Sequence, residues 1–371
     1  MRTQNREGTI QGLSGLKLNR RRAIQALGAG SATALATRGL AAPARARQEI
    51  GGELVFRTWG GPMTDVLQTA WVDPFQEQFG VTVVMDTGEL PEVQLQQQKG
   101  NPQYDVVALN RIQVHQLRNE EVLQQLDDTV VPNLANVYPE LASQYGISAP
   151  AYFGEMGLVY NTEHVTTTPT SWEELWKTEY AGHVATPTGV DGGDLFIPPI
   201  ANMVGTSWDG DLAPVWEKLA ELKPNVLTQY SSAGQLLNLL ETEDAWLAPW
   251  YNGRSWNAIE QALPLGYVTP EEGATIVLID MVIPQGAPNI EAAYAFVNFA
   301  LEPEQQAAFA EGFSYAPSRM DVELPEEVAQ RMPYGQEGIG KLIIPDWDEF
   351  DSMRVDWAEE WNKIFGAPAE S

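Results

Sequence analysis

Two kinds of hydrophobic pattern alternate along the chain from Glu53 onward. Short runs rich in Val, Ile and aromatic residues predict strands at 54–58, 81–85, 104–109, 244–250 and 275–283. Longer stretches with apolar residues at helical spacing predict helices at 64–79, 92–98, 111–119, 211–222, 231–241, 290–301, 304–313 and 351–365. This alternation is typical of α/β layers with largely parallel sheets, so we predict an α/β fold.

Local signals indicate where some helices begin and end and which residues they bury. Gly80 is the expected end of the first helix, and Ser171–Glu174 has capping-box spacing at the start of a short one. The acidic run 346–351 lacks the glycine and closing glutamate of an EF-hand loop, so we interpret it as a solvated turn. The packing residues expected in 211–222 and in the last helix are Trp216, Leu219, Leu222, Val355, Trp361 and Phe365.

The first 46 residues have a different pattern. Arg20, Arg21 and Arg22 precede an Ala/Gly/Leu-rich stretch, and Ala44-Arg45-Ala46 forms a small-x-small cleavage pattern. We predict a twin-arginine-type signal peptide over 1–46, with the mature protein exported to the periplasm or another extracytoplasmic compartment. The alternative is a single membrane span, which a short core interrupted by glycine disfavours.

Charge and cysteine content exclude several kinds of partner and site. The chain carries 22 Lys and Arg against 50 Asp and Glu, for a net charge of −28, and eight of those basic residues lie in the first 46. A mature surface this acidic repels nucleic acid and anionic lipid. Without cysteine there is no disulfide, no thiolate zinc site and no lipid-anchored N-terminus, so we do not expect a lipoprotein.

The length of 371 residues predicts two lobes.

No constellation of residues indicates catalysis. His115, His164 and His183 are far apart in the sequence and show no metal-ligand spacing. Gly60-Gly61 and Gly192-Gly193 are not accompanied by a P-loop or dinucleotide motif. We therefore expect neither an enzyme nor a cofactor or metal site.

The order of motifs resembles the family 1 extracellular solute-binding proteins of ABC importers, and most closely their spermidine/putrescine-binding branch. The similarity extends over almost the whole mature chain. The motifs that carry it are Arg57-Thr58-Trp59, Tyr104-Asp105-Val106-Val107, Ala149-Pro150-Ala151-Tyr152-Phe153-Gly154 through Gly157-Leu158-Val159-Tyr160-Asn161, Ser171-Trp172-Glu173-Glu174, Ala248-Pro249-Trp250-Tyr251-Asn252-Gly253-Arg254, Asp280-Met281-Val282-Ile283-Pro284 and Tyr315-Ala316-Pro317-Ser318-Arg319.

This resemblance implies a two-lobe periplasmic-binding-protein fold of type II-like topology, with the ligand in a cleft between the lobes. It implies lobe 1 at 52–157 plus 282–325 and lobe 2 at 158–281 plus 326–366. The crossing strands are expected near Leu158–Tyr160 and Asp280–Val282. It also implies an ABC permease as the membrane partner, and we expect a monomer.

The family's cleft aromatics correspond to Trp59, Phe153 and Trp250, although any of these can instead fill the core. Trp59 is the strongest candidate because it ends a strand before a Gly-Gly turn, where loops open into the crevice of an α/β sheet. Polyamine binders of the family carry acidic residues at places that here hold Gly60-Gly61 and 188–191. Only Asp191 or Asp194 can substitute for them, and we favour Asp194 as the N-cap of the following helix.

Arg254 and Asp280 suggest a different solute. A guanidinium just after the Trp250 strand suits bidentate capture of a carboxylate, although a surface ion pair is the alternative. Asp280 lies in an otherwise apolar strand and requires a partner, either from the protein or from the ligand. If both face the cleft, the pair fits a zwitterion.

We therefore predict an exported solute-binding receptor of an ABC importer for a small amine or amino-acid-like solute, a polyamine or a zwitterionic ω-amino acid or opine. A sugar-binding receptor of the same architecture, or an exported adhesion or assembly module, is the alternative. Iron-binding relatives use adjacent tyrosines, and no Tyr-Tyr pair occurs here.

Overall fold

The computed structural model describes residues 50–88 and 91–366, without the side chains of Pro91, Val190 and Asp191. The predicted signal peptide at 1–46 lies outside the described residues. Within the described ranges, no helix combines the length and the apolar composition needed to cross a bilayer.

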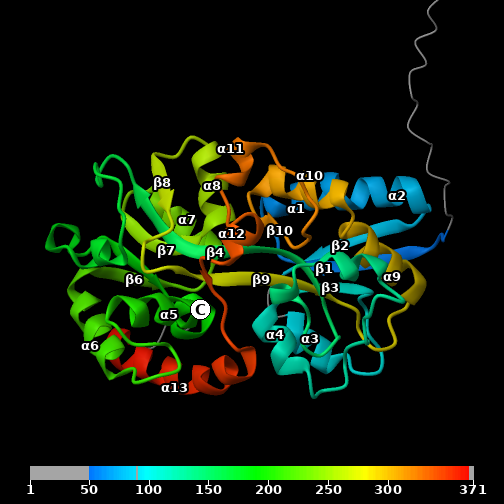
Figure 1. Cartoon of the computed structure of the whole chain (residues 1–371), viewed down its shortest axis with the longest axis horizontal. Coiled ribbons are helices and arrows are strands. Elements are labelled where there is room, and N and C mark those ends of the chain that lie inside the picture. Colours follow the sequence, from blue (N-terminus) through cyan, green and yellow to red (C-terminus); the bar gives the residue numbers. More distant parts are fainter. Residues whose placement is uncertain (1–49, 89–90, 367–371) are drawn as a thin grey trace, which may run out of the picture. The chain divides into compact units, whose positions relative to one another are not determined.

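The described residues form one mixed sheet of eleven strands, in the order β2-β1-β3-β9-β4-β7-β5-β6 (Figure 1). Three short strands lie off this path, since β8 and β10 pair with β4, and β11 pairs with β9. The strands are β1 (Glu53–Thr58), β2 (Thr82–Thr87), β3 (Val106–Asn110), β4 (Ala149–Asn161), β5 (Val184–Pro187), β6 (Val226–Tyr230), β7 (Leu247–Tyr251), β8 (Leu265–Val268), β9 (Ala274–Val282), β10 (Ala316–Pro317) and β11 (Leu342–Ile343).

Strand directions divide the sheet into two parallel ends joined by an antiparallel centre. Strands β2, β1 and β3 run parallel to one another, and we call this end the β1 side. Strands β7, β5 and β6 also run parallel, and we call this end the β5 side. The long strands β4 and β9 join the two ends through antiparallel pairs. The predicted α/β fold is confirmed, and the antiparallel centre is the part that pattern alone did not predict.

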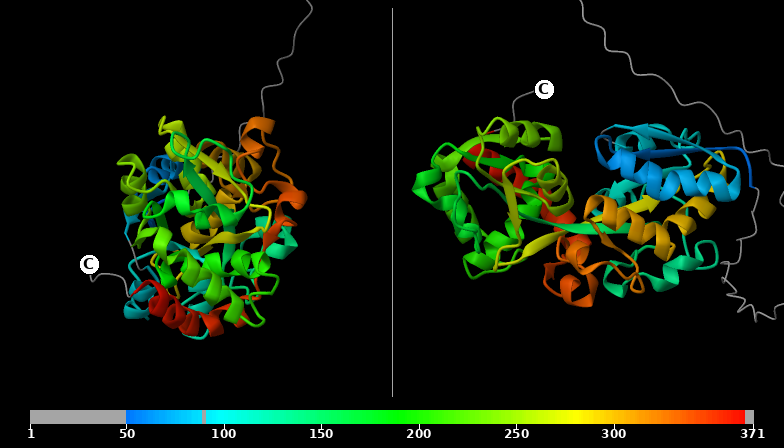
Figure 2. Two further views of the ribbon diagram at one scale, coloured as in Figure 1. Left: turned by 90° about the vertical axis from the view of Figure 1, so that its left-hand side faces the viewer. Right: turned by 90° about the horizontal axis from the view of Figure 1, so that it is seen from above.

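Strands β4 and β9 pass between the two sides (Figure 2). They pair with each other between Ala149–Met156 on β4 and Thr275–Met281 on β9. Leu158–Tyr160 pair with β7 and β8, and Asp280–Val282 pair with β3. Both segments expected to cross therefore lie towards the ends of β4 and β9, where these two strands pair with the strands of the two sides. The lobe boundaries proposed from the resemblance stay a prediction.

Helices cover the sheet, and most lie where apolar periodicity predicts them (Figure 1). The α-helices are α1 (Met63–Leu67), α2 (Asp73–Phe79), α3 (Pro91–Gln97), α4 (Arg111–Leu117), α5 (Asp194–Met203), α6 (Ala213–Leu222), α7 (Ala233–Glu241), α8 (Asn252–Glu260), α9 (Ile290–Ala300), α10 (Pro303–Phe313), α11 (Glu326–Ala329), α12 (Gly335–Ile339) and α13 (Trp347–Phe365). Two π-helical segments, η1 (Gln68–Val72) and η6 (Gly189–Gly193), adjoin α1, α2 and α5, and the 3-10 helices are η2 (Pro132–Asn136), η3 (Pro139–Leu141), η4 (Trp172–Trp176), η5 (Thr178–Tyr180) and η7 (Lys223–Asn225).

The expected helix ends are confirmed in two places. Gly80 ends α2 in the left-handed conformation at φ 68°, which only glycine adopts without strain. The hydroxyl oxygen of Ser171 accepts a hydrogen bond from the Glu173 amide, and the five-residue 3-10 helix η4 follows it.

The last helix differs from expectation at its start and on one face. Asp346 caps α13 by accepting bonds from the Asp348 and Glu349 amides, so the acidic run begins a helix and is not a solvated turn. Trp361 is fully buried as predicted, but Val355 is 70% exposed and the prediction for it was wrong. Helical geometry explains this, because the buried stripe runs through Phe350, Trp357 and Trp361 and leaves Val355 on the opposite face.

Glu155 is a buried carboxyl group on β4, 5% exposed. Burial raises its pKa, while hydrogen bonds from Thr269 and Tyr267 lower it. The folded protein therefore holds this proton over a pH range in which the unfolded chain has released it, and the resulting stability is lost as the pH rises through the folded-state pKa.

We expect Glu155→Gln to raise the melting temperature at pH 8 by on the order of 2 °C. At this pH the carboxyl group must either bind a proton on folding or be buried with its charge, and the amide avoids both costs. At pH 4 the two proteins should melt together. Thermal unfolding by circular dichroism at both pH values tests this, and an equal offset at pH 4 and pH 8 would contradict the titration of Glu155.

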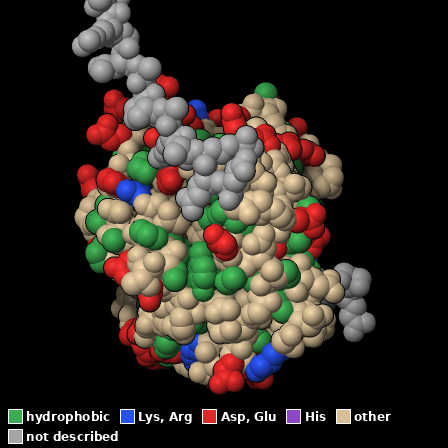
Figure 3. All heavy atoms as spheres, turned by 90° about the vertical axis from the view of Figure 1, so that its right-hand side faces the viewer, with side chains coloured by type: hydrophobic (Ala, Val, Ile, Leu, Met, Phe, Trp, Pro, Cys, Tyr) green, Lys and Arg blue, Asp and Glu red, His purple; other side chains and the backbone are tan. Residues whose placement is uncertain are grey.

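The surface agrees with the acidic composition. On the face shown in Figure 3, acidic side chains clearly outnumber basic ones. A surface of this sign attracts cations and repels polyanions.

Candidate functional site

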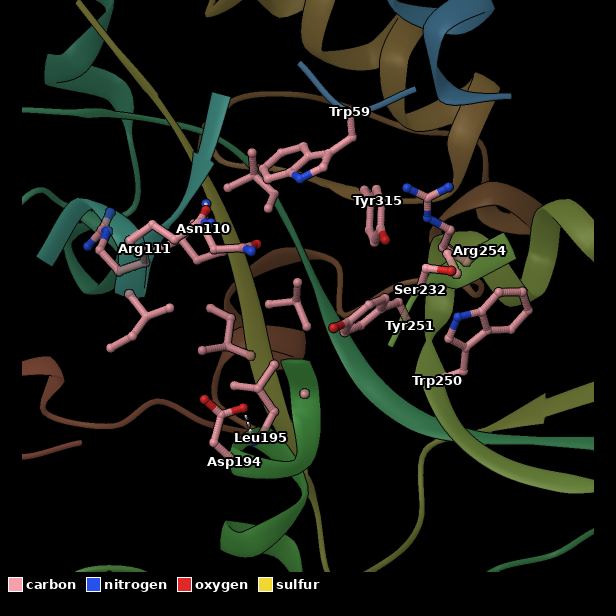
Figure 4. Close-up of a pocket in the computed structure, with 18 of the residues that line it drawn as sticks. Trp59, Asn110, Arg111, Asp194, Leu195, Ser232, Trp250, Tyr251, Arg254 and Tyr315 are labelled. Carbon is pink, nitrogen blue, oxygen red and sulfur yellow. Dashed lines mark hydrogen bonds between the residues drawn. The ribbon is translucent and has the colours of Figure 1, made fainter. Parts of the chain in front are cut away.

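A cavity of about 400 Å³ lies where β4 and β9 pass between the two sides (Figure 4). The β1 side and the helices after its strands contribute Trp59, Met63, Glu92, Asn110, Arg111, Ile112, Gln113 and Gln116. The β5 side contributes Gly192, Asp194, Leu195, Tyr230 to Ala233, Trp250, Tyr251 and Arg254. The remaining walls are Tyr152 of β4, Ile276 to Ile279 of β9, Tyr315, and Trp347 and Arg354 of α13.

Trp59 is a cavity wall, in the place that the sequence predicted. It follows the end of β1, its ring is partly exposed, and Figure 4 shows the indole extending over the open space. Its backbone carbonyl accepts a bond from the Thr64 hydroxyl at the start of the next helix. The strand end and the helix start together fix the position of this ring.

The sequence predicted Trp250 as an aromatic wall of the cleft, but its neighbour Tyr251 forms more of the exposed wall. Trp250 is 2% exposed and packs in a hydrophobic cluster with Tyr230, Leu236 and Ala258, so only its margin reaches the cavity. Tyr251 is partly exposed and projects into the open space in Figure 4. Successive side chains of a strand point to opposite faces, and this alternation was the signal that Tyr251 is the more exposed aromatic wall.

Arg254 and Tyr315 form a pair at one end of the cavity (Figure 4). Burial raises the pKa of Tyr315 to about 12, although a hydrogen bond and the positive charge of Arg254 oppose the rise. The guanidinium also lies 6.0 Å from the centre of the Phe313 ring. Among the described residues, no carboxylate lies within ion-pairing distance of Arg254, so this charge is available to a solute.

Asn252 holds the Tyr315 loop against β4. It is fully buried, accepts a hydrogen bond from the Glu155 amide at 3.1 Å and donates to the Ser314 carbonyl at 2.6 Å. A Cβ on Gly154 would lie 2.2 Å from the Asn252 side-chain oxygen and 2.5 Å from the Tyr315 ring. Close packing therefore requires glycine at position 154.

Asp280 has a protein partner and contributes no exposed surface to the cavity. It is fully buried, and Arg111 donates to both carboxylate oxygens, at 2.6 and 2.9 Å. The same guanidinium donates to the Leu141 and Ala142 carbonyls. The sequence left open whether the partner of Asp280 comes from the protein or from the ligand. In this structure the partner is a protein side chain, that of Arg111. Arg111 follows β3 directly and was identifiable as a strand-end residue.

The sequence offered two other acidic candidates, Asp194 and Asp191, and the cavity wall adds the carboxylate of Glu92. The N-cap of α5 is Gly193, so the prediction that Asp194 caps this helix was wrong. Asp194 is instead the first residue of α5, accepts a bond from the Leu195 amide and forms an ion pair with Arg354 of α13. Glu92 accepts a bond from Gln113 at 2.8 Å. The side chain of Asp191 lies outside the described residues.

Phe153 is fully buried in the main core and does not line the cavity. Sequence reasoning did not select several polar and aromatic residues of the cavity wall, among them Tyr251, Tyr315, Arg111, Asn110, Glu92, Trp347 and Arg354. Among the described residues, no group of three or more His, Asp or Glu side chains is arranged to hold a metal ion.

Known proteins resemble the chain over most of its length. Residues 70–333 match the family described as bacterial extracellular solute-binding protein. The spermidine/putrescine-binding periplasmic protein of Salmonella typhimurium is 26% identical over 302 residues, covering 79% of this chain and 83% of that protein. The gamma-aminobutyric acid-binding protein of Pseudomonas aeruginosa is 26% identical over 343 residues, covering 87% and 93%. A crystal structure of an ABC transporter from Clostridium perfringens superimposes with a TM-score of 0.68 at 25% identity, covering 84% and 99%.

Proposed function

Because the chain belongs to the bacterial extracellular solute-binding protein family and acts as a receptor of an ABC importer, we propose that its solute is a small amino-acid-like zwitterion. The family consists of binding receptors and not of enzymes. We propose that the carboxylate of the solute pairs with Arg254 and that its ammonium lies against the aromatic walls of the cavity.

The charge of Arg254 is the observation that carries this proposal. A guanidinium that lines a cavity and has no acidic partner among the described side chains suits a carboxylate, which it binds with two parallel hydrogen bonds. The cavity volume of about 400 Å³ lies in the range of small-molecule sites. Trp59, Tyr251 and Tyr315 offer ring faces that attract an ammonium group.

A long polyamine fits these walls less well. Each ammonium of a polyamine needs a carboxylate or a ring face, and two of the nearby carboxylates already pair with arginines, Asp280 with Arg111 and Asp194 with Arg354. Arg254 adds a positive charge that repels a polycation. The relative from Pseudomonas aeruginosa named for gamma-aminobutyric acid supports the zwitterionic alternative.

Calorimetry of the mature protein against 4-aminobutyrate, an opine, putrescine, spermidine and glucose tests the proposal. We expect binding of at least one amino-acid-like solute and a raised melting temperature with it, because ligand bound only by the folded state stabilises it by mass action. Binding of spermidine with no response to any carboxylate would overturn it, and binding of glucose alone would favour a sugar receptor.

We expect Trp59→Ala to weaken binding of the amino-acid-like solute by about 2- to 30-fold, the effect of losing a cation–π contact of roughly 0.5 to 2 kcal/mol. Trp216→Ala is the matched control, because Trp216 is also partly buried but lies on α6 and does not line the cavity. Titration calorimetry measures both. An equal loss in the two variants would assign the effect to the fold and not to the solute contact.

Homology places this receptor in the periplasm or outside the cell. We propose export through the twin-arginine-type signal at 1–46, with the mature protein beginning near Arg47 or Gln48. Replacing Arg21 and Arg22 by lysine should then retain the precursor in the cytoplasm, as cell fractionation would show.

A further inference from the structure

Helix α13 is built mainly onto the β5 side of the molecule. Trp361 is fully buried and donates a hydrogen bond at 2.8 Å to Gln229 of β6. Trp208, which precedes α6, packs edge-on against Phe350 and Trp357 at 5.9 and 6.4 Å between ring centres. These contacts fix the body of α13 to the β5 side.

The first turn of α13 instead contacts α4, which follows β3 on the β1 side. Asp348 lies 2.6 Å from the ring nitrogen of His115 and 3.2 Å from the Arg118 guanidinium, and it accepts a bond from the Tyr145 hydroxyl. Asp351 accepts a bond from Gln116 at 3.2 Å. One helix therefore connects the two sides through a polar cluster, which we call the Asp348 cluster: His115, Arg118, Tyr145 and Asp348.

The Asp348 cluster lies beside the cavity. Gln116 of α4 and Trp347 of α13, each next in sequence to a member of the cluster, both line it. His115 is 2% exposed, so its contact with Asp348 is shielded from water on one side. Hydrogen bonds from Tyr145 and His115 lower the pKa of Asp348, because they stabilise its charged carboxylate.

We propose that Asp348 is a positioning residue for solute binding, which holds α13 against α4 and thereby keeps the two sides of the cavity together. Asp348 touches no solute in this scheme. Asp348 instead raises the fraction of molecules whose cavity is assembled. When that fraction falls, the apparent affinity of the protein for the solute falls in the same proportion. The proposal rests on the receptor function and is independent of which solute is bound.

The separation of the two sides can be measured without any solute. Because the chain has no cysteine, Val84→Cys and Leu227→Cys introduce the only two labelling sites. These residues are 42% and 43% exposed and lie on β2 and β6, the opposite ends of the sheet. Spin labels at both positions report the distance between the β1 side and the β5 side by pulsed electron resonance.

In this labelled background we expect Asp348→Ala to add a population with a longer distance between the labels. Glu360→Gln is the matched control. Glu360 also forms an ion pair on α13, with Lys363 at 2.6 Å, but this pair is distant in sequence from the first turn of the helix. We expect the control to reproduce the parent distances. Identical distance distributions in the parent and in Asp348→Ala would overturn the proposal.

Solute affinity gives a second measurement. If one molecule in ten keeps the cavity assembled, Asp348→Ala raises Kd for 4-aminobutyrate about tenfold. A failure of 4-aminobutyrate to bind the parent protein would count against the proposed solute, while the label distances still test Asp348. Should Asp348→Ala not fold, as judged by circular dichroism, Tyr145→Phe removes one of the same contacts at a residue that is 37% exposed. Unchanged distances in that variant would then overturn the proposal.

Discussion

Arg254→Gln should weaken the binding of 4-aminobutyrate by about 30-fold or more. Removing one partner of a hydrogen-bonded charge pair costs roughly 2 to 5 kcal/mol, and each 1.4 kcal/mol changes Kd about tenfold. Glutamine keeps a polar side chain of similar reach, so the loss reports the charge. Titration calorimetry of the mature protein measures it. Arg254→Lys should recover only part of the affinity, because an ammonium does not offer the two parallel donors of a guanidinium.

Arg331→Gln is the control for Arg254. Arg331 is also partly buried and lies over the Trp256 ring at 5.5 Å, but it pairs with Glu260 and does not line the cavity. We expect this control to bind 4-aminobutyrate as the parent does. Full affinity in Arg254→Gln would exclude a carboxylate at this position and remove the main support for a zwitterionic solute.

Asp280→Leu should destabilise the protein by about 3 to 5 kcal/mol, the second large effect that we expect. The variant leaves the Arg111 guanidinium buried without its carboxylate, and an uncompensated buried charge is costly. The double variant Arg111→Met with Asp280→Leu should recover most of the loss, because two apolar side chains replace the pair. Urea denaturation of the three proteins measures these free energies of unfolding.

The same variants decide the role of Asp280 in binding. A carboxylate that holds Arg111 in place affects mainly stability, so the double variant should fold and still bind the solute, with affinity reduced less than in Arg254→Gln. If Asp280 instead contacts the solute directly, the double variant would fold but lose binding altogether.

Local patterns predicted the elements better than their arrangement. Gly80 and the apolar spacing of 64–79 predicted the first helix within one residue, because helix ends and periodicity depend on neighbouring residues. Val355 was placed wrongly because a helix of mixed composition contains more than one possible apolar stripe, and only the packing of Trp208 and Phe350 selects the buried one.

The sequence predicted those residues of the candidate site that directly follow a strand. It did not predict the contacts between residues far apart in the sequence. Trp59 and Arg254 each follow a strand, and both line the cavity. The ion pair between Asp280 and Arg111 could not be predicted, because the two residues are 169 positions apart in the sequence and no local pattern connects them. Phe153 and Trp250 are aromatic, as residues that line a binding cleft often are. Only the burial of their side chains in the structure shows that they belong mainly to the core.

The position of α13 after every strand of the β5 side has a consequence for the order of folding during synthesis. Trp357 and Trp361 complete the core of that side, yet they are made after the strands that they cover. The β1 side likewise needs β9, which pairs with β3 across a large part of the chain, as in the pair Val107 and Val282. Neither half of the cavity can therefore finish folding before these later segments are made, and such contacts between distant segments form slowly. The receptor reaches its final form only once α13 has been synthesised, an order of events that suits the proposed export route, which carries folded cargo.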